Sequence, residues 1–183
     1  TLNKFIGNNI TSGGSLSPSA DSIVYNNTVL GALTVLKGDE VYNNTFVGND
    51  AVIGTAICAL SGGSYGSPDV EIIGNDFIIN GASTINSGNG AQVYDNTFIG
   101  DYTIKFNNAN AKNITFANND VIGNIEFGNK NAKGNKIVNN TITTSKDYAI
   151  DLKTYVDTET NITDNILNSK NGFGGGIVAR AGQ

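Results

Sequence analysis

The sequence predicts an all-β solenoid of about eight coils, in which short strands stack along one axis. A segment made of an apolar residue, two variable residues and an Asn recurs eight times, with the Asn residues 18, 17, 31, 21, 23, 21 and 25 positions apart. Apolar and polar residues alternate after many of the copies, and the periodicity of an amphipathic helix is absent. Repeats of this length are typical of solenoids, because each repeat buries its hydrophobic face only against its neighbours.

Each coil begins with a short strand. The residue three positions before the repeated Asn is apolar in all eight copies and is mostly β-branched or aromatic, as is typical of strands. We therefore expect this position to face the core. The eight residues are Ile6, Val24, Val41, Ile72, Val93, Phe116, Ile137 and Ile162.

A corner follows at the repeated Asn itself. Asn tolerates left-handed backbone better than most residues do. Its amide both donates and accepts hydrogen bonds, so each Asn can bond to the Asn of the next coil. A buried amide without partners would cost about 1–3 kcal/mol. We expect an internal ladder that consists of Asn9, Asn27, Asn44, Asn75, Asn96, Asn119, Asn140 and Asn165.

Two further strands complete the coil. The residue two positions after the Asn is apolar in seven of the eight copies, Thr11 being the exception, and an internal stack is expected of Phe46, Phe77 and Phe98. Because glycine adopts positive φ without steric cost, a bend is expected at Gly31, Gly48, Gly100 and Gly123. The third strand carries one of the apolar pairs Leu33/Val35, Ile104/Phe106, Ile125/Phe127 and Ile150/Leu152. The longest insertion contains the loop-like segment 61–68.

The composition indicates a single β-helix domain over residues 1–183, with 39% hydrophobic residues. The net charge is −5, and Arg180 is the only arginine, so the clustered basic residues that bind nucleic acid are missing. No apolar run approaches the roughly 20 residues of a membrane span. A lone cysteine cannot form an intrachain disulfide, and we expect Cys58 to be a buried structural thiol. Because the repeat begins almost at the first residue and no starting Met is present, we expect a processed chain or part of a longer one.

The pattern from about Phe5 to Ile177 resembles the right-handed parallel β-helix repeats of the pectate-lyase-like superfamily. It is most similar to the repeat arrays of adhesin-like surface proteins of bacteria and methanogenic archaea. Right-handed connections are also what parallel sheets favour. The resemblance implies an extracellular or cell-surface location and a non-enzymatic, structural or adhesive role.

Enzymes of this superfamily act mainly on polysaccharides. The hydrolases use clustered aspartates with a histidine, and the lyases generally need calcium-binding carboxylates with a basic residue. This chain has no histidine, and its single arginine is not near an aspartate cluster in the sequence, so no catalytic residue is carried over.

One pair of carboxylates remains as an alternative. Glu126 and Asp151 occupy equivalent outward positions on neighbouring coils, and Lys105 precedes them in the same column. Glycoside hydrolysis needs two carboxyl groups about 5–9.5 Å apart, so this pair would suit a polysaccharide-active enzyme. A solvated ladder of charges is the other interpretation, and the one we favour. No cofactor is expected. Asp and Asn oxygens are suitable calcium ligands, so a structural calcium ion bound in a turn remains an alternative.

The outward positions carry the remaining candidates. A column of exposed aromatic and aliphatic side chains, two positions before the Asn, consists of Tyr25, Tyr42, Ile73 and Tyr94, and Ala117 and Val138 continue it. It can bind sugar rings, pack against another chain, or only stabilise the outer face. A second apolar column either faces outward or lines a corner, and consists of Leu30, Val47, Ile78, Ile99 and Ile122.

Six sites match the sequence rule for N-glycosylation, although the repeat itself generates Asn-Asn-Thr. They are Asn9, Asn26, Asn43, Asn113, Asn139 and Asn161.

The two ends of the solenoid expose strand edges that can pair with another chain. The expected partners are therefore a cell-surface glycan or protein, or further copies of the chain in a homo-oligomer or an end-to-end filament.

Overall fold

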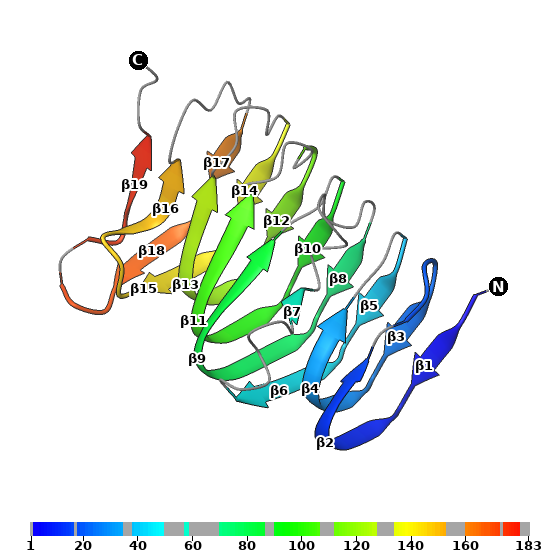
Figure 1. Ribbon diagram of the computed structural model, residues 1–183. Helices are drawn as coiled ribbons and strands as arrows, with labels where there is room; N and C mark the ends of the chain where they lie inside the picture. Colours follow the sequence, from blue (N-terminus) through cyan, green and yellow to red (C-terminus); the bar gives the residue numbers. More distant parts are fainter. Residues whose placement is uncertain are drawn as a thin grey trace.

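The structure, a computed structural model, describes residues 2–16, 18–34, 38–49, 57–58, 70–86, 90–106, 112–127, 134–152, 160–172 and 174–179. Every regular element in these residues is a β-strand, and every strand pairs in parallel with its neighbours. The predicted all-β solenoid is therefore confirmed (Figure 1).

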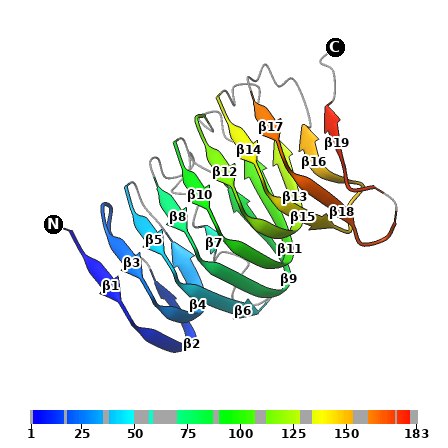
Figure 2. The same ribbon diagram turned by 180° about the vertical axis from the view of Figure 1, so that it is seen from behind.

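Sheet A forms one side of the solenoid and holds eight strands of three residues each. In both chain order and spatial order these strands are β1 (Lys4–Ile6), β3 (Ile23–Tyr25), β5 (Glu40–Tyr42), β8 (Glu71–Ile73), β10 (Gln92–Tyr94), β12 (Thr115–Ala117), β14 (Lys136–Val138) and β17 (Asn161–Thr163). Equivalent residues of successive repeats are paired, so each position of the strand forms a column along the axis (Figure 2).

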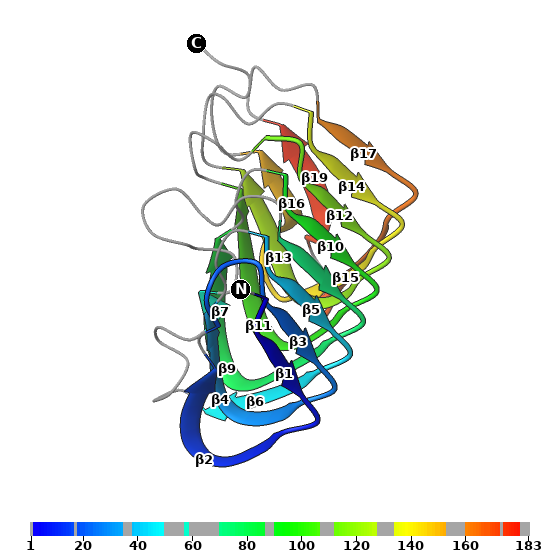
Figure 3. The ribbon, with the colours of Figure 1, turned by 90° about the vertical axis from the view of Figure 1, so that its right-hand side faces the viewer.

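Sheet B curves around the bottom of the solenoid and up its opposite side (Figure 3). Its main path consists of β2 (Asn9–Leu16), β4 (Thr28–Thr34), β6 (Thr45–Asn49), β9 (Asp76–Asn86), β11 (Thr97–Phe106), β13 (Asp120–Phe127), β15 (Thr141–Thr144) and β18 (Ile166–Ser169). Three shorter strands join this sheet beside the path, namely β7 (Ile57–Cys58), β16 (Tyr148–Leu152) and β19 (Gly176–Ala179).

The number of turns is lower than expected. Each of the eight repeats supplies a strand to sheet A, but the described residues trace a solenoid of about five turns. Parts of the links that lead from sheet B back to sheet A lie outside the described residues, as do Val35, Arg180 and the expected loop 61–68. Cys58 belongs to strand β7, but its side chain is also outside them.

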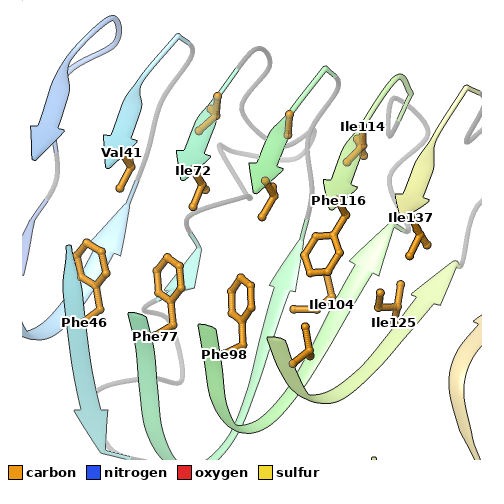
Figure 4. Close-up of a cluster of buried hydrophobic side chains, with 14 of the residues drawn as sticks. Val41, Phe46, Ile72, Phe77, Phe98, Ile104, Ile114, Phe116, Ile125 and Ile137 are labelled. Atoms are coloured by element: carbon orange, nitrogen blue, oxygen red, sulfur yellow. The ribbon is translucent and has the colours of Figure 1, made fainter. Parts of the chain in front are cut away.

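The core is a filled interior between the two sheets. The expected stack is present, with ring centroids 5.2 Å apart for Phe46 and Phe77 and 5.0 Å apart for Phe77 and Phe98. Phe116 extends it from the opposite sheet, 6.0 Å from Phe98 (Figure 4). Where the Phe column ends, the next position of sheet B is Val121, so Phe116 fills the space that a smaller side chain leaves.

The first coil corrects the predicted register by one residue. Phe5, not Ile6, is paired with Val24 and packs against the core, while Ile6 is 53% exposed. In the same way Ile10, not Thr11, is paired with the core residue of the next repeat. The segment Asn8-Asn9 offers two ways to align the motif, and the burial of two apolar side chains decides between them. A slip by one residue would turn both of them to the opposite face.

The corner is also built differently from the prediction. The ladder Asn is not the left-handed residue; the residue before it is, with φ between 52° and 67°. These left-handed residues are Gly7, Asn26, Asn43, Gly74, Asp95, Asn118, Asn139 and Asp164. They are the residue types that tolerate this backbone conformation best, and their side chains need no place in the core.

A bend divides the longer strands of sheet B into two legs. Gly100 and Gly123 have φ of 149° and 150°, and the pairing between β11 and β13 shifts in register around them. This confirms the bend predicted at these two glycines. Gly31 and Gly48 also lie inside strands, β4 and β6, and the pairing of β2 with β4 shifts in register directly before Gly31. In the later coils the two legs become separate strands, because β13 pairs with β15 along its first leg and with β16 along its second.

Candidate functional site

The Asn ladder is a continuous internal chain of hydrogen bonds. At each step the backbone N–H and the Nδ2 of one Asn both donate to Oδ1 of the next Asn, as in the pair Asn44 and Asn75 at 2.8 and 2.9 Å. Nδ2 also donates to backbone carbonyls, for example from Asn44 to Val24 O at 2.9 Å. The ladder consists of Asn8, Asn27, Asn44, Asn75, Asn96, Asn119, Asn140 and Asn165.

Two conclusions follow from the ladder. It begins at Asn8, and the predicted Asn9 is instead an exposed residue of β2 that pairs with Thr28. Its interior amides use their donors and acceptors within the protein, so this column stabilises the coil and is not a site for chemistry.

A second buried column was missed by the sequence analysis. It lies one residue before sheet A and consists of Ser22, Asp39, Val70, Ala91, Ile114 and Asn135. Asp39 Oδ1 accepts from Ser22 N at 2.9 Å, and Asn135 Oδ1 accepts from Ile114 N at 3.0 Å. The residue types vary between apolar and polar along this column, so no single motif marks it in the sequence.

The outer face of sheet A carries the predicted tyrosine stripe, defined as the column of Tyr25, Tyr42, Ile73 and Tyr94. The four residues are paired in register on neighbouring strands, and Ala117 and Val138 continue the column. Tyr25 is 41% exposed, Tyr42, Ile73 and Tyr94 are partly buried, and Ala117 is buried. The stripe is therefore a continuous, partly exposed surface of aromatic and aliphatic groups.

The tyrosine hydroxyls hold two of the rings against the sheet. Tyr42 Oη donates to Glu71 Oε2 on the next strand, and Tyr94 Oη donates to Gln92 Oε1 at 2.7 Å on its own strand. Burial, followed by the hydrogen bond and the negative charge of Glu71, raises the pKa of Tyr42 well above its usual range. Because each hydroxyl reaches another outward residue of the sheet, these rings lie along the surface and do not stand away from it.

The second predicted column also faces outward. Leu30 is 39% exposed and Ile99 is 42% exposed, while Val47, Ile78 and Ile122 are partly buried. This answers the question that the sequence left open, whether these residues line a corner or the surface. They form an aliphatic column on the first leg of sheet B, away from the tyrosine stripe on sheet A.

A groove lies on the outer side of sheet B, where its second leg meets the turn between β15 and β16. The volume of the groove is about 380 Å³. Its lining consists of Asn124, Glu126, Ser145, Lys146, Asp147, Tyr148 and Asp151. The sequence-predicted pair is therefore brought together, because Glu126 and Asp151 are paired in register on β13 and β16 and both line the groove. Lys105 is paired with Glu126, but its side chain is outside the described residues.

Polar contacts hold the floor and the rim of the groove. Asn124 is 3% exposed; its Oδ1 accepts from Thr103 Oγ1 at 3.2 Å, and its Nδ2 donates to Glu126 Oε1 at 3.2 Å. Lys146 Nζ lies 3.3 Å from Asp101 Oδ2, so it reaches across the coil between them. The sequence analysis missed these residues, because only the folded solenoid places the turn 145–147 beside the two carboxylates.

The six possible glycosylation sites are all exposed. Asn26, Asn43 and Asn139 are left-handed corner residues, and Asn113 has the same backbone conformation two residues before strand β12. Asn139 Nδ2 donates to Asn118 Oδ1 at 3.0 Å, so this side chain also has a partner within the protein.

Among the described residues, no group of three or more His, Cys, Asp and Glu side chains is arranged to hold a metal ion. The described part of the chain also includes no helix with the length and hydropathy needed to span a bilayer. Comparisons with protein-family models, curated proteins and solved structures gave no significant match.

Proposed function

We propose that the chain is a non-enzymatic, extracellular β-solenoid of the adhesin-like type, with a coil related to those of the pectate-lyase-like superfamily. In this proposal the protein is a rigid rod whose outer faces bind carbohydrate at a cell surface. The fold supplies rigidity through the Asn ladder and the packed core. It also repeats each outward side chain at the spacing of neighbouring strands, about 4.8 Å.

The tyrosine stripe is the observation that carries the proposal. Aromatic rings with a polar end suit surfaces that bind hydroxyl-rich ligands, because the ring packs against apolar C–H groups while the hydroxyl keeps its hydrogen bond. Two rings are held along the sheet by Glu71 and Gln92, so little side-chain entropy is lost on binding. A column of partly exposed apolar groups is also the kind of surface that marks interaction sites.

The binding test uses the variant Tyr25→Ala/Tyr42→Ala/Tyr94→Ala against a panel of immobilised cell-surface polysaccharides. Ile99→Ala is the matched control, because Ile99 is exposed to a similar degree on the other sheet. We expect the triple variant to bind at least about tenfold more weakly, since loss of central aromatic residues typically costs more than 1 kcal/mol each. Unchanged binding would leave the stripe a purely structural feature. Release of new reducing ends from any polysaccharide would contradict the non-enzymatic role.

A filament subunit is the second candidate, and the direction of the ladder favours it. Every Asn-to-Asn hydrogen bond of the ladder runs from one coil to the next coil on its C-terminal side, so Asn165 of one copy can donate to Asn8 of another only when the copies stack head to tail. Such a contact is heterologous and would extend without limit. Electron microscopy and light scattering of the pure chain would detect these filaments, and a monodisperse monomer at high concentration would rule them out.

A further inference from the structure

We infer that the outer face of sheet A binds a second copy of this chain, in a two-fold symmetric dimer whose solenoid axes run antiparallel. The two-fold axis lies parallel to the strands, between the two β10 strands, so that β5 of each copy faces β14 of the other. The dimer does not rest on the carbohydrate binding proposed for the tyrosine stripe. A carbohydrate and a second copy would use the same face, so the two compete where both bind.

A second outward column, the charged column, runs beside the tyrosine stripe. Its residues lie two positions before those of the stripe on the same strands, so they face the same side of the sheet. The column consists of Lys4, Ile23, Glu40, Glu71, Gln92, Thr115, Lys136 and Asn161. The two acids lie in the N-terminal half of sheet A, and Lys136 lies in the C-terminal half.

The charged column complements itself when it is turned end for end. Glu40 and Glu71 are paired in register, and like charges at paired positions repel each other. Lys136 is exposed, and its register neighbours Thr115 and Asn161 are uncharged. The antiparallel arrangement brings Lys136 of each copy opposite Glu40 of the other. Because the contact is isologous, this ion pair forms twice in one dimer.

The tyrosine stripe complements itself in the same arrangement. Its large side chains lie in the N-terminal half of sheet A, and Ala117 and Val138 continue the column in the C-terminal half. Tyr42 therefore faces Val138 of the second copy. Ile73 faces Ala117, and the two Tyr94 rings meet at the symmetry axis. A larger side chain meets a smaller one on either side of the axis, as close packing of two faces requires.

A parallel arrangement of two copies fits this face less well. It would place the charged column of each copy against the tyrosine stripe of the other, and burying Glu40 and Lys136 without partners is costly. In the antiparallel arrangement sheet A, which runs straight along the solenoid (Figure 2), aligns over the seven strands from β3 to β17. Each strand is only three residues long, so the buried area is small. Small interfaces are typically weak, and we expect a dimer that dissociates on dilution.

Sedimentation equilibrium of the full chain, at concentrations up to about 1 mM and without carbohydrate, tests the dimer. We expect a monomer–dimer equilibrium that shifts toward the monomer at high salt. Lys136→Glu and Glu40→Lys should each weaken dimerisation at least about tenfold, because each replaces two attractions with two repulsions. The double variant Glu40→Lys/Lys136→Glu should recover dimerisation to within about threefold of the wild type, since it exchanges the two charges and keeps them complementary.

The matched control is Lys170→Glu, which makes the same change of charge at an exposed residue after β18 of sheet B. It should leave dimerisation unchanged, and each variant is first compared with the wild type by thermal unfolding. The inference is overturned if the chain stays monomeric at the highest concentration, if Lys136→Glu has no larger effect than Lys170→Glu, or if the double variant does not recover. Binding to immobilised polysaccharides is measured at concentrations where the chain is monomeric, so failure of either proposal leaves the test of the other intact.

Discussion

Asn96 lies in the middle of the Asn ladder, and its replacement by Ala measures what the ladder contributes to stability. The residue is 1% exposed. Its Nδ2 donates to Asn119 Oδ1 at 3.0 Å and to Ile72 O at 2.8 Å. Its Oδ1 accepts from Asn75 N at 2.9 Å and from Asn75 Nδ2 at 3.1 Å. The substitution removes these four contacts at once.

The expected magnitude follows from the groups that are left behind. The N–H of Asn75 loses its Oδ1 acceptor in a buried site, and an unsatisfied buried donor costs about 1–3 kcal/mol. The side-chain amide of Asn75 is affected less, because it keeps its bonds to Val41 O and Ile73 O. With the remaining lost hydrogen bonds at about 1 kcal/mol each, we expect Asn96→Ala to lower the free energy of unfolding by about 2–5 kcal/mol.

Urea unfolding followed by far-ultraviolet circular dichroism is the assay. Asn8→Ala is the matched control, because Asn8 belongs to the same ladder but is exposed. Water can replace its lost hydrogen bonds, so this variant should cost less than about 1 kcal/mol. The reasoning is refuted if Asn96→Ala costs less than about 1 kcal/mol, or if the two variants cost the same.

Asn96→Asp adds a test by pH. It keeps an oxygen that can accept from Asn75 but turns a second oxygen toward Asn119 Oδ1 and the carbonyl of Ile72. Burial without a cation raises the pKa of the introduced carboxyl in the folded state. The folded state then binds more protons than the unfolded state above about pH 3.9, so stability falls as the pH rises. We expect the stability difference from the wild type to shrink on acidification, and a difference that is constant with pH would contradict this.

Two further predictions concern the corner and the tyrosine stripe. Asn26 has φ of 55°, so Asn26→Gly should be tolerated. Asn26→Val should lower the free energy of unfolding by about 1–2 kcal/mol, because left-handed backbone crowds a branched side chain. Equal urea midpoints for the two variants would contradict the assignment of the corner. Tyr42 should stay protonated in an ultraviolet titration while ordinary tyrosines ionise near pH 10, and Glu71→Gln should bring its pKa closer to normal. Because its pKa is higher in the folded than in the unfolded state, Tyr42 stabilises the folded state below about pH 10, and this stabilisation is lost as the pH rises further. Glu71→Gln should therefore reduce the loss of folding stability above about pH 10.

The columns that face the core were predictable because the chain repeats them. Apolar residues such as Val24 and Val41 recur at fixed distances from an Asn, and a stacked solenoid is the structure that buries all of them together. The Phe stack and the bends at Gly100 and Gly123 follow from the same alignment. The fold class and most of the core could therefore be determined without coordinates.

The register of a degenerate motif could not be predicted in this way. The first repeat reads Ile6-Gly-Asn-Asn9, which fits the consensus as well as the correct alignment through Phe5 and Asn8 does. Only the pairing of Phe5 with Val24 and the exposure of Ile6 separate the two. The same limit explains the corner, because Asn-Asn pairs such as Asn26-Asn27 do not show which member turns the chain and which one joins the ladder.

The candidate groove was predictable in part. Glu126 and Asp151 could be paired from the sequence, since both stand between two apolar residues of equivalent strands. The sequence could not place Asn124 and the turn before Tyr148 around them, because a turn of irregular length has no counterpart in the other repeats.

By itself, the sequence determined that this protein is a β-solenoid with an Asn ladder, because periodic burial is a property of spacing alone. The tertiary structure decided which asparagines bond and which ones turn, since backbone conformation and hydrogen-bond direction depend on the neighbouring coil. It also decided where the outer surface is hollowed, because a groove arises only when side chains from several coils surround the same space.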